Sequence, residues 1–445
     1  MLRARMLASA IIVTVSSSLL FFAPGAHSTT PFDKINHMII VMQENRSFDN
    51  YLGQLAAYDP SLGVEAEPNT GNLDPNGNLI TPFHQSSYCE VVDLDHSWNG
   101  THNEWNNGAM DGFAKANAKD VDPTGSRAMG YYDQTDLPFY YSLYDTFAMS
   151  DTYFSSVLDQ TFPNRFYLLA GTSFGHVAND FPVPPGNTDP VHDYAQTTVF
   201  NRLDDNNVSW KVYFEEVPFS FLFGYNRTHA AGHVFPISQY FADAASGNLP
   251  QVSFIDPVFI ATVNVENDEH PPANVQMGQL ATSKVINALF ESPNWSDSAL
   301  FLTYDEHGGY YDHLPPPSAI KPDSIAPRIK ATDYQAEFDN LGIRVPFTVV
   351  SPYSKSHYVS SALPQASAIY DHPDKVYSHT SILRTIEERF GLGTLTARDA
   401  ASNDLADLFD FSASTFATPP TLAPAVVDPA KVAECETREH VPTDL

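Results

Sequence analysis

Three near-continuous apolar runs constrain the fold of this chain more than any other feature of its sequence. They read HMIIVM at residues 37–42, ALFLTYDE at residues 299–306 and FTVVSPY at residues 347–353. Unbroken apolar runs of this length are typical of strands that are buried on both faces. Strict alternation of apolar and polar residues would instead indicate a strand with one solvent-exposed face. The runs therefore predict a central sheet that is covered on both sides.

Stretches with helical spacing lie between these runs. Residues 277–290 carry apolar side chains on one face of a helix, and a second helix is expected to begin at Ser378 or Thr380 and to end near Gly391. Alternating strands and helices are the pattern of an α/β fold built on a parallel sheet. Residues 54–90, 176–195 and 215–236 are rich in turn-forming residues and are expected to be long loops.

The first 28 residues resemble a secretory signal peptide. Arg3 and Arg5 precede an apolar stretch, and the small-residue segment PGAHS follows it, so cleavage is expected after Ser28. An uncleaved membrane anchor is the alternative, although three serines interrupt the apolar stretch. We expect the mature protein to be secreted, either extracellular or periplasmic.

Residues 29–412 are expected to form one catalytic domain, and residues 413–445 a Pro-rich tail that is packed on the domain or extends from it. The only two cysteines, Cys89 and Cys435, could form a disulfide after export and so join the tail to the body. Two free thiols are the alternative. The sequence does not indicate the oligomeric state.

The strong negative charge excludes some partners. The chain has 53 acidic and 23 basic residues, which gives a formal net charge of -30 at pH 7. Such a surface repels nucleic acid and anionic membranes, so we expect no nucleic-acid partner. No second apolar run of spanning length follows the first, and stable membrane insertion is not expected either.

Polar pairs that follow two of the apolar runs predict a metal site. Glu44 and Asn45 follow the first run, and Asp305 and Glu306 end the second. Ligand sites in parallel sheets lie beyond the carboxyl ends of the strands, although two solvated strand ends would give the same pattern. Carboxylate and carbonyl oxygens favour Mg²⁺, Ca²⁺ or Mn²⁺, and the 16 histidines keep Zn²⁺ open as a fourth candidate.

Thr161 in the segment DQTFPNR is the candidate nucleophile. Next to a divalent cation its hydroxyl could ionise, attack phosphorus and form a phosphothreonine that water later hydrolyses. Thr161 as a plain helix N-cap is the competing interpretation, because Pro163 lies where a first-turn proline would. The two interpretations are compatible, since a helix N-terminus favours an anion.

Histidines in polar loops are candidates for the proton donor to the leaving group. Among them we favour His96 and His270, because acidic residues that could orient the ring lie beside each of them. His379 is expected to start a helix near the site. Further residues are assigned to substrate binding, namely Asn164, His102 and His313.

Seven segments together resemble the phosphoesterase family of bacterial phospholipases C and acid phosphatases, within the alkaline-phosphatase-like superfamily. They occur in the family's order over roughly residues 35–395 and read MIIVMQENRSFDNYLG, DHSWNGTHNEWNNGAMDGF, DQTFPNRFYLLAGTS, NDEHPPANVQMGQ, LFLTYDEHGGYYDHLPPP, IRVPFTVVSPYSK and YSHTSILRTIEERFGL. The resemblance implies a three-layer α/β/α sandwich with a central, mostly parallel sheet. It also implies a divalent metal held by Glu44, Asn45, Thr161, Asp305 and Glu306, with Thr161 as nucleophile.

The resemblance extends to the neighbouring positions. Family members place Ser or Thr at the position of Thr161, often after a Gly, where this chain has Gln160. His96 and His270 match histidines that the family uses around the phosphate. His307 falls where relatives vary, and it is left out of the catalytic set.

The expected function is that of a secreted, metal-dependent phosphoesterase of phospholipase C type. An acid phosphatase that acts on monoesters, or a non-catalytic binding protein on the same fold, are the alternatives. The aromatic segment VPFSFLFGY, residues 217–225, could contact a phospholipid surface or could pack on the core. Sulfatase chemistry is excluded, because neither cysteine lies in a CxPxR context and Thr161 cannot be converted to formylglycine.

Overall fold

A central sheet organises the computed structural model, which describes residues 30–180, 196–363 and 370–438. Among these residues the sheet has eight strands, in the order β13-β6-β12-β11-β1-β10-β8-β9. All neighbours pair in parallel except at β12, which runs antiparallel to both β11 and β6. The strands span Tyr358–Ser360 (β13), Ala148–Ser150 (β6), Phe347–Val350 (β12), Ser298–Tyr304 (β11), His37–Gln43 (β1), Val252–Asp256 (β10), Trp210–Phe214 (β8) and Val234–Pro236 (β9).

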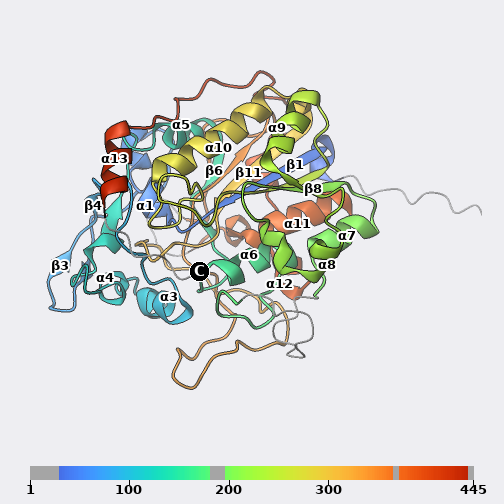
Figure 1. Cartoon of the computed structure of the whole chain (residues 1–445). Coiled ribbons are helices and arrows are strands. Elements are labelled where there is room, and N and C mark those ends of the chain that lie inside the picture. The colour runs from blue at the N-terminus through green and yellow to red at the C-terminus, as the bar shows by residue number, and fades with distance from the viewer. Residues whose placement is uncertain (1–29, 181–195, 364–369, 439–445) are drawn as a thin grey trace, which may run out of the picture.

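Helices cover both faces of this sheet, as Figure 1 shows. One face carries α5 (Pro138–Thr146), α9 (Ile237–Ser246) and α10 (Val275–Phe290). The other carries α6 (Thr161–Ala170), α7 (Val199–Asp205), α8 (Gly224–Thr228), α11 (His379–Phe390) and α12 (Ala397–Ala401). The expected α/β/α sandwich with a mostly parallel sheet is confirmed.

Shorter elements complete the described part of the chain. The remaining α-helices are α1 (Phe48–Leu52), α2 (Leu55–Tyr58), α3 (Trp98–Trp105), α4 (Phe113–Ala116) and α13 (Pro429–Thr437). Two-stranded pairs join β7 (Tyr153–Phe154) to β14 (Tyr377–Ser378), β2 (Asn72–Leu73) to β3 (Leu79–Ile80), and β4 (Phe83–His84) to β5 (Gly130–Tyr131). Single 3₁₀ turns are η1 (Pro31–Lys34), η2 (Asn106–Gly108), η3 (Ser126–Met129), η4 (Phe219–Leu222), η5 (Pro293–Asp297), η6 (Pro373–Lys375) and η7 (Ala406–Leu408).

The three predicted strands lie side by side in the centre of the sheet. β1 and β11 pair in parallel, from His37 opposite Ser298 to Gln43 opposite Tyr304. β12 ends at Val350, three residues before the predicted end, because Pro352 has no N–H to donate to a neighbouring strand and a turn begins at Ser351. The antiparallel direction of β12 was not predictable from its apolar run.

Both predicted helices are present. α10 begins at Val275, two residues before the expected start, because the side chain of Asn274 caps the backbone N–H of Gln276. α11 begins after Ser378, which forms a capping box with Ser381, and it ends at Gly391 with a φ of 66°.

Two of the expected loops and the tail contain more regular structure than predicted. Residues 54–90 include α2, β2, β3 and β4, and residues 215–236 include η4, α8 and β9. Helix α13 forms in the tail because Pro429 occupies its first turn and Asp428 caps the N–H of Ala430. A disulfide joins Cys435 of this helix to Cys89, with the Cα atoms 5.8 Å apart.

The expected signal peptide and most of residues 176–195 lie outside the described residues.

The aromatic side chains of residues 217–225 pack inward. Phe223 is buried, and its ring lies 5.3 Å from that of Phe166 on α6. The ring of Phe219 lies 5.3 Å from that of Phe162. Of the two interpretations of this segment, core packing therefore describes Phe219 and Phe223.

Glu387 on α11 has a buried carboxyl group. Burial, with the nearby Asp399 carboxylate, raises the pKa of Glu387 to about 10. A raised pKa means that the folded chain favours the protonated form. Below the pKa that Glu387 has in the unfolded chain, its contribution to the free energy of unfolding is fully present. This contribution is lost progressively as the pH rises from that value toward 10.

We expect Glu387→Gln to flatten the dependence of stability on pH. The neutral amide cannot ionise, so the variant should avoid a loss of about 1.4 kcal/mol per pH unit between pH 5 and pH 8. Urea unfolding at both pH values measures this, with the exposed Glu291→Gln as a matched control. An unchanged pH dependence in Glu387→Gln would show that this carboxyl does not titrate as described.

Candidate active site

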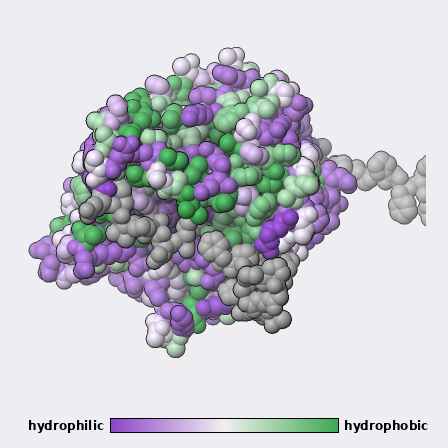
Figure 2. Space-filling view, in the orientation of Figure 1, coloured by the Kyte–Doolittle hydropathy of each residue, from purple (hydrophilic) through white to green (hydrophobic). Residues whose placement is uncertain are grey.

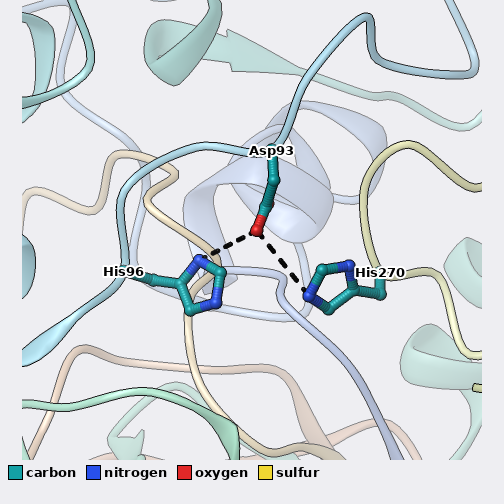
Figure 3. A group of neighbouring side chains, drawn as sticks. All are labelled: Asp93, His96 and His270. Atoms are coloured by element: carbon teal, nitrogen blue, oxygen red, sulfur yellow. Dashed lines mark ion pairs between the residues drawn. The ribbon is translucent and has the colours of Figure 1, made fainter. Parts of the chain in front are cut away.

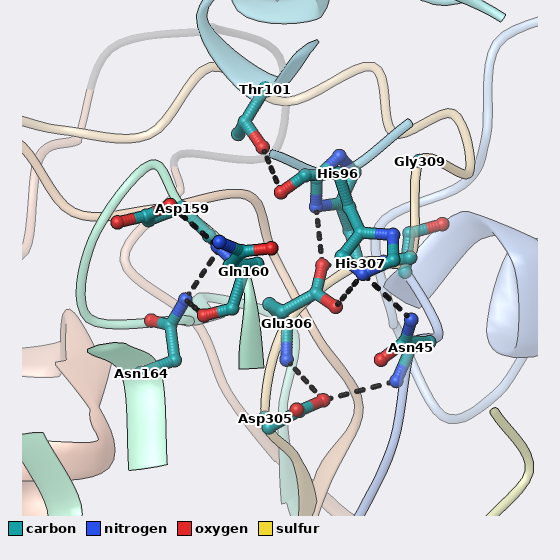
Figure 4. Close-up of polar contacts among 12 residues, drawn as sticks. Asn45, His96, Thr101, Asp159, Gln160, Asn164, Asp305, Glu306, His307 and Gly309 are labelled. Carbon is teal, nitrogen blue, oxygen red and sulfur yellow. Dashed lines mark hydrogen bonds and ion pairs between the residues drawn. The ribbon is translucent and has the colours of Figure 1, made fainter. Parts of the chain in front are cut away.

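Two neighbouring strand ends form the centre of the candidate site. Because β1 and β11 are parallel and in register, the residues that follow them emerge at the same edge of the sheet. The backbone N–H of Asn45 donates to Asp305 Oδ1 over 3.0 Å, and the N–H of Glu306 donates to the same oxygen over 2.7 Å (Figure 4). Asn45 has a φ of 61°, which turns the chain sharply after the strand.

The N-terminus of α6 brings Thr161 to this edge. Thr161 is the first residue of the helix and is 2% exposed. Among the described residues its Oγ1 has no hydrogen-bond partner, so it does not act as the cap of α6. Gln160 precedes it with a φ of -80°, a conformation open to any residue, and the turn does not require the Gly that relatives often have.

Asn164 holds the turn before Thr161. Its Oδ1 accepts the N–H groups of Ser156 and Val157 over 2.8 and 3.0 Å. Its Nδ2 donates to the backbone oxygen of Asp159 over 2.7 Å. These bonds use the amide group, and the assignment of Asn164 to substrate binding stays a prediction.

Arg165 is a site residue that we did not predict. It lies one helical turn after Thr161, and its Nη2 is 2.9 Å from Glu44 Oε1 while its Nε is 3.7 Å from Asp305 Oδ2. The i, i+4 spacing from Thr161 was visible in the sequence and could have indicated a residue on the same face of the helix. The contacts of Arg165 show that the start of α6, Glu44 and Asp305 meet in one place.

Burial and mutual repulsion act on the three carboxylates of the site. Burial raises the pKa of Glu44 against the opposing effect of Arg165. Burial, Glu44 and Glu306 hold the pKa of Asp305 well above its usual value. Burial also works against ionisation of Glu306, but His96 and His307 outweigh it and lower the pKa of that carboxyl.

The unpaired oxygens of the predicted ligands are of the kind that a divalent cation binds. Oxygens of four of the five predicted ligands are buried without a hydrogen-bond partner among the described residues, namely Asn45 Oδ1, Thr161 Oγ1, Asp305 Oδ2 and Glu306 Oε1. The fifth ligand, Glu44, is paired with Arg165. Buried acceptors without a donor are costly, and a hard cation satisfies such oxygens.

His96 and His270 flank this group together with Asp93, which we did not predict (Figure 3). His96 Nε2 is 3.9 Å from Glu306 Oε1 and 3.4 Å from Asn45 Nδ2. Burial opposes a charge on His96, but the carboxylates of Asp93 and Glu306 outweigh it and raise its pKa to about 10. The two carboxylates therefore favour a proton on His96.

His307 also belongs to the site, although we left it out of the catalytic set. Its Nδ1 lies 3.1 Å from Glu306 Oε2 and its Nε2 lies 2.7 Å from Glu104 Oε2. Burial disfavours the charged ring, but the two glutamates outweigh it and raise the pKa of His307 to about 9. His379 lies where expected, with its Nε2 2.6 Å from the backbone oxygen of Asp305.

His102 and His313 have structural partners elsewhere. His102 donates from Nδ1 to the backbone oxygen of Trp98 over 2.6 Å and stacks on Tyr334, with ring centroids 4.6 Å apart. His313 lies between Asp49, at 2.6 Å from its Nδ1, and Glu65, at 2.7 Å from its Nε2. His102 is thus packed among aromatic rings and His313 is ion-paired, and their assignment to substrate binding stays a prediction.

Comparison with known proteins shows that this chain is a hydrolase that acts on phosphoric ester bonds. Residues 35–393 match the model of the Phosphoesterase family, and the chain belongs to this family. It is 32% identical to Phospholipase C B of Mycobacterium tuberculosis over 87% of this chain and 80% of that protein. It is 32% identical to Non-specific phospholipase C1 of Arabidopsis thaliana over 82% of this chain and 69% of that protein. Among solved structures, a protein in the alkaline phosphatase superfamily from Vibrio parahaemolyticus aligns with 83% of this chain and 69% of its own at 10% identity, with a TM-score of 0.37.

We expect Glu44→Ala or Asp305→Ala to weaken binding of Mn²⁺ and Ca²⁺. Loss of an outer-sphere partner already costs a metal site about 10–100-fold in affinity, so loss of a ligand should cost at least about tenfold. Calorimetric titration of each variant, with metal analysis of the same preparation, measures this. The exposed Glu216→Ala is the control. Affinity equal to that of the parent in both variants would remove Glu44 and Asp305 from the ligand set.

Proposed function

We propose that this chain is a secreted, metal-dependent phosphoesterase of phospholipase C type that works through a phosphothreonine at Thr161. The observation that carries the proposal is the Thr161 hydroxyl, which is buried without a partner among the described residues at the start of α6. A buried hydroxyl is costly to leave unpaired, and such sites persist where a ligand or substrate completes them.

The residues that would hold the cation are Glu44, Asn45, Thr161, Asp305 and Glu306. When bound, a divalent ion polarises a phosphoryl oxygen and lowers the pKa of an adjacent hydroxyl. The oxygen-rich set favours Mg²⁺, Ca²⁺ or Mn²⁺, and Zn²⁺ is compatible with the nearby imidazoles.

The side chains of the site have separate tasks in the reaction. Thr161 Oγ1 releases its proton to solvent and forms a bond to phosphorus while the bond from phosphorus to the leaving oxygen breaks, and it takes up a proton from solvent again when water displaces it. Protonated His96, or His270 beside it, gives a proton to that leaving oxygen. In the second half of the reaction the same imidazole takes a proton from water, whose oxygen displaces Thr161 from phosphorus.

The N-terminus of α6 supports this chemistry through its backbone. The first N–H groups of a helix have no intrahelical acceptor, and the helix dipole favours negative charge there. Thr161 occupies the first position of a ten-residue helix. A phosphate group on Thr161 therefore lies where the backbone favours an anion.

The choice of a phospholipid over a simple monoester is supported by two observations. The relatives in Mycobacterium tuberculosis and Arabidopsis thaliana are named as phospholipases C. Aliphatic side chains on the loops near Arg165 are exposed, with Val217 45%, Ile260 53% and Val265 59% accessible. The face shown in Figure 2 mixes hydrophilic and hydrophobic residues, so on that face lipid contact would come from individual side chains.

A membrane-spanning helix is not part of this proposal. No helix within residues 30–180, 196–363 and 370–438 has the length and apolarity needed to cross a bilayer. The net charge of -30 disfavours anionic lipids and permits zwitterionic choline lipids. An acid phosphatase that acts on monoesters is the second candidate, and a direct comparison of phosphatidylcholine with simple phosphate monoesters distinguishes the two.

Export is proposed from the N-terminal sequence. If residues 1–28 act as a signal peptide, the exported chain begins at Thr29. N-terminal sequencing of the protein recovered outside the cytoplasm tests this, and an intact Met1 there would contradict cleavage.

We expect Thr161→Ala to lower kcat on 4-nitrophenyl phosphocholine and 4-nitrophenyl phosphate by at least about 10³-fold, because it removes the nucleophile. Thr161→Ser keeps a hydroxyl and should stay within about tenfold of the parent. Steady-state kinetics of both variants, with thermal unfolding as a check on folding, gives the answer. Turnover by Thr161→Ala at the parental rate would end the nucleophile proposal, and a parent that hydrolyses neither ester would favour a non-catalytic binding protein.

A further inference from the structure

One carboxylate oxygen lies between two imidazoles that come from distant parts of the chain. Asp93 Oδ2 is 3.5 Å from His96 Nδ1 and 3.8 Å from His270 Nε2 (Figure 3). The two rings are nearly perpendicular, with centroids 5.7 Å apart. Asp93 and His96 lie on the loop before α3, whereas His270 lies between β10 and α10.

The remaining contacts of the two rings show what this arrangement fixes. His270 Nδ1 is 2.6 Å from the backbone oxygen of Pro271 and donates to it, so its Nε2 is the nitrogen that faces Asp93. His96 Nδ1 is also 3.1 Å from the backbone oxygen of Leu94, which leaves Nε2 directed at Asn45 and Glu306. A backbone oxygen and the Asp93 carboxylate together thus hold His96 Nδ1 on the side of the ring away from Asn45 and Glu306.

The same contacts argue against a metal ion between these three side chains. A metal ligand must be a nitrogen without a proton. His96 Nδ1, however, faces the carbonyl oxygen of Leu94, an acceptor that requires a proton on that nitrogen. This leaves Asp93 and His270 as the only two ligands of the group.

The backbone that carries Asp93 is held on several sides. Lys119 Nζ donates to the backbone oxygen of Asp93 over 2.9 Å, and Arg127 Nη1 donates to that of Val92 over 2.7 Å. Two residues further on, the N–H of Asp95 donates to Asn117 Oδ1 over 2.7 Å. A carboxylate on a segment fixed in this way can orient its partners with little freedom of its own.

We propose that Asp93, which lies between His96 and His270, is a positioning residue for His96 and holds its ring in the orientation needed for proton transfer from Nε2 to the leaving group. This inference rests on the proposed function, because it gives Asp93 a task in the same reaction. Proton transfer depends strongly on the placement of donor and acceptor, so loss of the orienting carboxylate affects the step that needs the proton.

The test compares two esters that differ in how much their leaving groups need a proton. 4-Nitrophenyl phosphocholine releases a stable phenolate, whereas short-chain phosphatidylcholine releases an alcohol that must be protonated. Asp93→Asn should lower kcat/KM by about 10²-fold on the lipid and by less than about tenfold on the nitrophenyl ester. The exposed Asp120→Asn removes the same charge elsewhere and should leave both values unchanged.

An equal loss on both esters, or no loss on either, would overturn the role of Asp93. Metal analysis of the same preparations should show parental metal content in Asp93→Asn, and a loss of metal would overturn the proposal by making Asp93 a ligand. If Asp93→Asn does not fold, the same comparison is made with Asp93→Glu, which keeps the carboxylate but displaces it. A selective loss on the lipid again supports the role, and an equal loss or none overturns it.

The parent protein separates this test from that of the proposed function. A parent that hydrolyses neither ester contradicts the proposed function itself. A parent that hydrolyses both, together with a variant that shows no selective loss, contradicts the role of Asp93 alone.

Discussion

The parallel pairing of β1 with β11 is the constraint on which the rest of the site depends. Gln43 and Tyr304 are register partners, so both strands end at the same level and the residues that follow them leave the sheet at the same edge. A slip of one residue would send Glu44 or Asp305 to the opposite face of the sheet. The bond from the Asn45 N–H to Asp305 Oδ1 then fixes the two strand ends to each other.

Charge at this edge of the sheet is paired by a residue of α6. Carboxylates gathered in a buried place repel one another, and removing them from water is costly. Arg165 offsets part of that cost by pairing with Glu44 and approaching Asp305, and the first turn of α6 lies at the same edge. The oxygens that stay unpaired among the described residues, including Thr161 Oγ1, are those a cation and a phosphate ester would use.

The fold and the meeting of Glu44 with Asp305 at one sheet edge could be predicted from the sequence because both depend on local signals. Apolar runs give buried strands, and the polar residues that end them, such as Glu44 and Asp305, must emerge together if the strands are parallel. The direction in which a side chain points depends on tertiary contacts and not on the nearby sequence. Asn164 and His102 lie in the right segments, yet the first holds a turn and the second stacks among aromatic rings. Asp93 was missed because its role exists only where two distant loops meet.

The central claim is that one cation is held jointly by the strand-end oxygens and the Thr161 hydroxyl. Anomalous diffraction from crystals soaked with Mn²⁺ tests it most directly, because the metal is located independently of any activity. A single peak within about 2.6 Å of both Asp305 Oδ2 and Thr161 Oγ1 is the predicted result. A peak that lies away from Thr161, or no peak beside Asp305 at saturating Mn²⁺, would contradict the claim.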